Sequence, residues 1–94
     1  MGLVLPMNPE APVVLCVNGG SSSLKLALVR VSPSGEDKLA VAVAERIGLP
    51  DHGLRIDRER VRARFEDHAG ALHCALDELA RRGFPEPDVV GHRL

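Results

Sequence analysis

The chain has 94 residues, of which 45% are hydrophobic and 27% charged, and its formal net charge at pH 7 is -1. This length suffices for one small domain, and the balanced charge argues against a nucleic-acid-binding protein, in which basic residues would dominate. The aromatic residues are Phe65 and Phe84 alone, so the sequence predicts a core built from aliphatic side chains.

The first residues, MGLVLPMNPEAP, lack the charged start and the long apolar run of a signal peptide. We therefore expect residues 1–12 to form a flexible leader. No apolar run approaches the length that crosses a bilayer, so the sequence predicts no membrane partner and a cytoplasmic protein. Cys16 and Cys74 lie far apart within apolar stretches, which favours two reduced thiols in the core.

Residues 13–17 and 23–31 are two apolar runs that we expect to form neighbouring strands. In the second run Leu24, Leu26 and Leu28 alternate with other residues, so they share one face of the strand. The Asn-Gly pair between the two runs tolerates the positive φ angles of a tight turn, and it therefore predicts a hairpin.

The next segments continue the sheet. Residues 31–38 (VSPSGEDK) are typical of a second turn, and residues 39–47 follow as a third strand that completes a meander. After a break at residues 48–53, residues 54–65 alternate apolar with charged side chains. This pattern predicts one or two exposed strands.

The charged residues in these segments have both a functional and a structural interpretation. A basic stripe on one face of a strand could be formed by Arg60, Arg62 and Arg64. Acids interleave with them, so a solvated edge strand is favoured over a site for an anion or a nucleic acid. Glu45 and Arg46, at the end of the third strand, are expected to form a structural ion pair.

One helix is predicted between Asp67, a suitable N-cap, and Gly83, a suitable terminator. Its apolar residues recur at three- and four-residue steps and would pack on the sheet. They are Ala69, Leu72, Leu76 and Leu79. After a proline-rich linker, residues 88–94 begin like a further strand. We expect residues 13–94 to form a partial domain, truncated at its C-terminal end.

The candidate site is the loop NGGSSS and the lysine that follows it. Its glycines allow close approach to backbone N–H groups, and successive N–H groups form anion-binding concavities. Ser21 and Ser23 add hydroxyl donors, Lys25 adds positive charge, and Asn18 can hold a metal-bound water or a phosphate oxygen. A plain hairpin with a solvated lysine is the structural alternative. The string is not a Walker A motif, which leads into a helix.

Four blocks of the sequence together resemble the acetokinase family, which includes acetate, propionate and butyrate kinases. They are VNGGSSSLKLAL from residue 17, ERIG at residues 45–48, HAGAL at residues 68–72 and VGHR at residues 90–93. The resemblance covers residues 13–94. It implies an α/β fold, namely the N-terminal part of an actin-like (ribonuclease H-like) domain, with β-hairpins, a helix and the start of a further strand.

By this resemblance, the expected function is that of an acetate kinase, which transfers the γ-phosphoryl of ATP to acetate, with Mg²⁺ or Mn²⁺, and forms acetyl phosphate and ADP. Asn18 would lie at the metal, and Ser21, Ser23 and Lys25 would bind the phosphates of ATP. Arg93 would bind the short-chain carboxylate, because a guanidinium holds a carboxylate in bidentate fashion. The resemblance also implies a homodimer for the full-length enzyme.

Full-length members of the family are several times longer, and their catalytic acid and histidine lie beyond Leu94. The resemblance therefore implies no catalytic residue within this segment, and we expect the isolated chain to be inactive alone. The alternatives are a non-catalytic phosphate-binding module and a non-functional remnant of such a kinase. The short last strand also predicts an open sheet edge through which the isolated chain self-associates.

Overall fold

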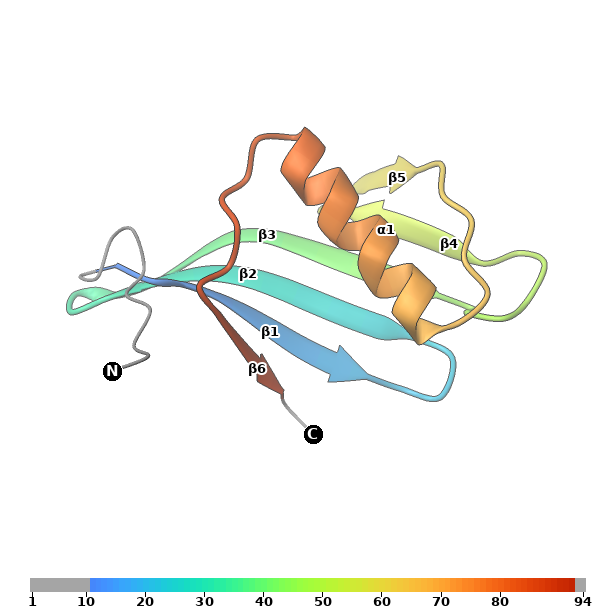
Figure 1. Ribbon diagram of the computed structural model, residues 1–94, viewed down its shortest axis with the longest axis horizontal. Coiled ribbons are helices and arrows are strands. Elements are labelled where there is room, and N and C mark those ends of the chain that lie inside the picture. Colours follow the sequence, from blue (N-terminus) through green and yellow to red (C-terminus); the bar gives the residue numbers. More distant parts are fainter. Residues whose placement is uncertain (1–10, 93–94) are drawn as a thin grey trace, which may run out of the picture.

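The computed structural model describes residues 11–92 as a six-stranded sheet with one helix on one of its faces (Figure 1). The strands are β1 (Val13–Gly19), β2 (Leu24–Ser32), β3 (Gly35–Glu45), β4 (Gly53–Ile56), β5 (Glu59–Val61) and β6 (Val89–His92), and the helix is α1 (His68–Arg81). This arrangement confirms the predicted α/β fold and fits the N-terminal part of an actin-like domain. Residues 1–10 of the predicted leader, and Arg93, lie outside the described residues.

The strand order is β5-β4-β3-β2-β1-β6. The first five strands form an antiparallel meander, whereas β6 lies parallel to β1 at the other edge. A parallel pair requires a long crossover, which α1 provides. Asp88 fixes the start of β6, since its N–H donates to the carbonyl of Val13 over 2.7 Å and its carboxylate accepts from the N–H of Val13 over 2.8 Å. The C-terminal ends of β1 and β6 therefore lie side by side.

The core fills the space between the sheet and α1. The predicted face of β2 is confirmed, because Leu24, Leu26 and Leu28 are all buried beneath the helix. Alternate residues of the neighbouring strands complete this layer, and they are Val13, Leu15, Val17, Ala40, Ala42, Ala44, Leu54 and Ile56. As the composition predicted, the layer is almost wholly aliphatic.

The helix has the predicted caps. Asp67 is the N-cap, and Gly83 follows the last turn with a φ of 87°, a conformation that glycine adopts without strain. The predicted apolar face is correct at Leu79 but wrong at Ala69, which is exposed. The small residues Ala71 and Ala75 are buried with Leu79 along the centre of the face and let α1 approach the sheet closely. Leu72 and Leu76 are partly buried and pack against the core from its flanks.

The turn between β2 and β3 is much shorter than predicted. β2 continues to Ser32 and β3 begins at Gly35, so two residues turn instead of the eight of residues 31–38. Residues 35–38, a glycine followed by three charged residues, are exposed, because the tip of the hairpin extends beyond the part of the sheet that the helix covers. A strand without a buried face lacks the apolar alternation by which a sequence reveals it.

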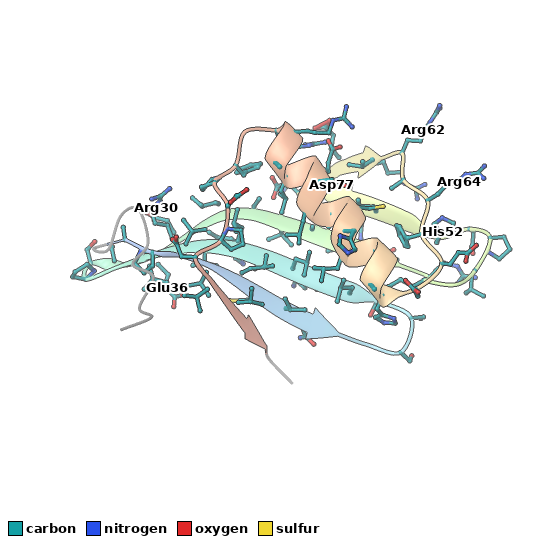
Figure 2. All side chains as sticks on the ribbon, viewed as in Figure 1. Arg30, Glu36, His52, Arg62, Arg64 and Asp77 are labelled. Carbon is teal, nitrogen blue, oxygen red and sulfur yellow. The ribbon has the colours of Figure 1, made fainter. Side chains whose placement is uncertain are left out.

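The segment 54–65 forms two short strands, one of the two predicted outcomes, but the predicted exposure is wrong for β4, whose Leu54 and Ile56 are buried in the core. The chain leaves the sheet after Val61, so the predicted strand face shared by Arg60, Arg62 and Arg64 is wrong. Figure 2 shows Arg62 and Arg64 pointing outward from the segment that follows β5.

The predicted ion pair between Glu45 and Arg46 is also wrong. Glu45 pairs with Arg55 across β3 and β4, and Arg46 pairs with Asp51 over 2.6 Å. Arg46 follows the end of β3 and has a positive φ of 54°, so the chain turns between the two residues and they meet different partners. Both residues still have the structural role that was predicted.

The two cysteines are free, as predicted, but only one borders the core. Cys74 of α1 packs against the core from its edge. Cys16 pairs with Ala27 on the face of the sheet that α1 does not cover, so its predicted place in the core is wrong. No helix among residues 11–92 is long and apolar enough to cross a membrane.

Candidate functional site

The loop between β1 and β2 comprises residues 20–23. Asn18 and Gly19 belong to β1 and pair with the first two residues of β2. Neither of them has a positive φ, nor does Gly20, so the predicted Asn-Gly turn is wrong. The hairpin closes instead through the N–H of Gly20, which donates to the carbonyl of Ser23 over 2.9 Å.

Three carbonyl oxygens of this loop accept hydrogen bonds from three parts of the chain. The carbonyl of Ser23 accepts from Gly20 within the loop, and that of Ser22 accepts from the N–H of Ile47 over 2.8 Å. The carbonyl of Gly20 lies 2.7 Å from Nε2 of His68. Since a carbonyl can only accept, Nε2 of His68 carries the hydrogen.

The N–H groups of the three serines in this loop, unlike its carbonyls, are not engaged by the rest of the described chain. Within residues 11–92, the N–H groups of Ser21, Ser22 and Ser23 donate to no hydrogen bond, and all three residues are exposed. The loop thus engages the carbonyls of Gly20, Ser22 and Ser23 inside the protein, while its three serines leave their N–H groups without a hydrogen bond in this part of the chain. That polarity suits an anion, because successive free N–H groups form a concavity of positive potential.

A close contact explains why the loop begins with glycine. A Cβ atom added at Gly20 would lie 2.6 Å from Oγ of Ser23, whereas one added at Gly19 would meet only the Cδ1 of Leu24 at 3.9 Å. A side chain at position 20 would therefore force the Ser23 hydroxyl to move, whereas the φ angle at this position is not positive and does not itself demand glycine.

Asn18 and Lys25 are direct cross-strand partners at the end of β1 and the start of β2. Both side chains are exposed on the face opposite α1, where they line a shallow cavity of about 350 Å³. The cavity extends along this face to Glu36 and Lys38; Figure 2 shows Glu36 near the opposite end of the sheet. The structure therefore brings together an amide and an ammonium group beside the serine loop.

The serines and Lys25 do not share a strand face. Ser21, Ser23 and Lys25 have the two-residue spacing that would place side chains on one face of a continuous strand. Residues 20–23 are a loop and not a strand, so this periodicity does not apply to the serines. They adjoin Lys25 through the hairpin itself.

Segments that are far apart in sequence meet at this end of the sheet. Ile47 comes from the ERIG block and His68 from the HAGAL block, and each holds one carbonyl of the serine loop. Figure 1 shows the N-terminal end of α1 next to the β1–β2 loop. The VGHR block adjoins the same place, because the last residue of β6, His92, pairs with Val17. Sequence reasoning selected all four blocks but gave Ile47 and His68 no role at the site.

The described residues offer little to a metal ion by themselves. Among residues 11–92 there is no group of three or more His, Cys, Asp or Glu side chains that could hold one. The amide oxygen of Asn18 is a suitable ligand for Mg²⁺, which binds oxygen donors. A metal ion at this loop would need most of its ligands from phosphate oxygens or from other polypeptide.

Comparison with known proteins supports the family resemblance that the four sequence blocks carry. The model of the Acetokinase family matches residues 13–94. The chain is 35% identical over 89 residues to the acetate kinase of Oceanobacillus iheyensis and 38% identical over 89 residues to that of Geobacillus kaustophilus. It is 37% identical over 92 residues to the acetate kinase of Streptomyces avermitilis. Each match covers 86% of this chain but 22% of the relative, so the chain spans about a fifth of the length of these relatives.

Proposed function

The chain belongs to the acetokinase family, and on that basis we propose that it is the phosphate-binding part of an acetate kinase. Such an enzyme transfers the γ-phosphoryl of ATP to acetate and forms acetyl phosphate and ADP. The observation that supports this role best is the loop at residues 20–23, in which three carbonyls are engaged and the N–H groups of the serines are exposed.

Phosphoryl transfer requires mainly positioning and charge stabilisation from the protein. In this proposal the N–H groups of the loop and the hydroxyls of Ser21 and Ser23 donate to phosphoryl oxygens, and the ammonium of Lys25 adds positive charge. Arg93, which follows β6 in the sequence, binds the carboxylate of acetate through its guanidinium. Acetate is the proposed substrate because the relatives are acetate kinases.

The proposed cofactor is Mg²⁺, or Mn²⁺, together with ATP. Asn18 offers a neutral oxygen to the ion or to one of its water molecules, and the phosphates supply further oxygen ligands. When bound, the ion neutralises part of the phosphate charge. We propose that the full-length enzyme is a cytoplasmic homodimer, as the resemblance implies.

The isolated chain is proposed to bind Mg-ATP without forming acetyl phosphate. The test measures Mg-ATP binding by calorimetry, and acetyl phosphate by trapping with hydroxylamine, for the wild-type chain and for Lys25→Ala. We expect weak saturable binding that Lys25→Ala reduces, and no acetyl phosphate. Failure of the wild-type chain to bind either Mg-ATP or inorganic phosphate would overturn the proposed role. Acetyl phosphate production that Arg93→Ala abolishes would show that the chain is active alone.

A non-catalytic phosphate-binding module is the second candidate, because the exposed N–H groups of the serine loop suit phosphate binding without any catalytic group. The two candidates differ in a mixing experiment. The Geobacillus kaustophilus acetate kinase would be prepared without the segment that this chain matches, and the 94-residue chain added to it. Restored acetyl phosphate production that Arg93→Ala abolishes supports the kinase, whereas phosphate binding without restored production supports the module. A non-functional remnant would show neither.

A further inference from the structure

We propose that His68 is a positioning residue for the serine loop: its Nε2–H holds the carbonyl of Gly20 and thereby directs the N–H of Ser21 toward a bound phosphate. This inference rests on the proposed function, since it concerns the same loop.

The planarity of the peptide bond gives the contact its consequence. The carbonyl of one residue and the N–H of the next belong to one planar trans unit and point in opposite directions. Holding the carbonyl of Gly20 over 2.7 Å therefore directs the N–H of Ser21 away from the helix. In the same way the bond from Ile47 to the carbonyl of Ser22 directs the N–H of Ser23.

The loop needs such a restraint. Glycine has more backbone freedom than any other residue, so the peptide unit after Gly20 can rotate readily when nothing holds it. Rotation would turn a carbonyl oxygen, with its negative partial charge, toward the anion in place of an N–H group. The His68 bond prevents this rotation, and the affinity of the loop for phosphate should therefore depend on it.

His68 is well placed to act as an anchor. It is the first residue of α1, and the helix start is fixed by the carboxylate of Asp67, which accepts from the N–H of Gly70 over 2.8 Å. One turn further on, Ala71 is fully buried against the sheet. The imidazole thus projects from a rigid element and reaches a loop 48 residues away in sequence.

The helix also offers a matched control. His73 lies on α1 with an exposed side chain, and it makes no hydrogen bond to any residue within the described part of the chain. The same substitutions can be made at both histidines. Glutamine keeps an N–H donor near the position of Nε2, whereas methionine has a similar length and no donor.

The experiment titrates the full ¹⁵N-labelled chain with Mg-ATP, and separately with inorganic phosphate, while the amide signals of Ser21 to Ser23 are followed. We expect His68→Met to weaken binding roughly tenfold, which corresponds to the loss of one oriented hydrogen bond. We expect His68→Gln to restore most of the affinity, and His73→Met to change nothing. In the wild type, the ¹⁵N spectrum of the imidazole should show hydrogen on Nε2 and a scalar coupling to the carbonyl carbon of Gly20.

The outcomes separate the two proposals. Wild-type binding that His68→Met leaves unchanged overturns the positioning role and leaves the proposed function intact. Absence of wild-type binding to both probes overturns the proposed function and this inference with it. Should His68→Met fail to fold, the wild-type imidazole spectrum and the phosphate affinity of His68→Gln test the positioning role instead. A missing coupling to the carbonyl carbon of Gly20, together with weak phosphate binding by His68→Gln, would overturn the inference.

Discussion

The N–H of Ile47 donates to the carbonyl of Ser22 over 2.8 Å, and so joins the segment after β3 to the serine loop. Ile47 is itself buried in the hydrophobic core. The orientation of the loop is therefore tied to the packing of the core, which is the stiffest part of a small domain. The ERIG and NGGSSS blocks, far apart in sequence, are therefore held next to each other in the fold.

Gly20→Ala should weaken phosphate binding while the fold is kept. The added Cβ would lie 2.6 Å from Oγ of Ser23, so the hydroxyl has to move away from its position in the loop. We expect roughly tenfold weaker binding of Mg-ATP, with little change in melting temperature because the loop is exposed. Gly19→Ala is the matched control, since its Cβ meets only an ordinary contact. Equal affinities of the two variants, measured by calorimetry, would contradict the steric argument.

The elements that the sequence predicts best are those with local signals. β1, β2 and α1 each bury one face and carry recognisable ends, so alternation, helical periodicity, Asp67 and Gly83 were sufficient to predict them. The start of β3 was missed because its exposed residues do not alternate with apolar ones. The Asn-Gly turn was wrong because strand pairing continues through Asn18 and Gly19, and tertiary pairing overrides local turn preference.

The residue types of the candidate site were predictable from the sequence, but the contacts that hold the serine loop were not. Ser21, Ser23, Lys25 and Asn18 lie close together in the sequence, so a local pattern could select them. The contacts from Ile47 and His68 arise only when α1 and the end of β3 pack around the loop. Non-local packing of this kind leaves no periodic signal in one sequence, although the ERIG and HAGAL blocks pointed to the segments concerned.

Asp67→Ala should destabilise the protein by about 1 kcal/mol, the usual contribution of an aspartate N-cap. The substitution leaves the N–H of Gly70 without its acceptor at 2.8 Å. For a domain of this size such a loss lowers the melting temperature by roughly 4–8 °C, which thermal unfolding followed by circular dichroism would measure. Asp77→Ala is the control, because Asp77 is exposed on the same helix beyond its first turn (Figure 2). An equal effect of both substitutions would argue against the cap.

The Arg46–Asp51 pair should make stability depend on acid pH. The hydrogen bond from Arg46 lowers the pKa of Asp51 and raises that of Arg46. The pKa of Asp51 is then lower in the folded protein than in the unfolded chain. The ionised carboxylate therefore stabilises the fold above a pH of about 4, and this stabilisation is lost as the pH falls through the folded pKa. Both side chains are largely exposed, at 58% and 62%, so the effect should be small and should weaken in salt.

Urea unfolding between pH 3 and 6, at low and high salt, would measure this dependence. Asp51→Asn should flatten the loss of stability at acid pH, whereas Asp37→Asn should not, because Asp37 is exposed and makes no ion pair within residues 11–92. Wild-type and Asp51→Asn curves of the same shape would show that the pair does not contribute.

The β6 edge should cause the isolated chain to self-associate. Among the described residues 11–92, β6 is the last strand of the sheet and pairs with β1 alone, and Val89 and Val90 are 53% and 54% exposed. An unprotected edge with apolar side chains is a template for pairing with another chain, and a lysine on such an edge opposes that pairing. We expect the sedimentation mass of the wild type to rise with concentration and Val90→Lys to stay monomeric. Leu49→Lys removes another exposed apolar side chain, in the connection before β4, and should leave association unchanged. If Leu49→Lys prevents self-association as well as Val90→Lys does, general surface hydrophobicity is responsible. A wild-type chain that stays monomeric at every concentration would rule out pairing through the β6 edge.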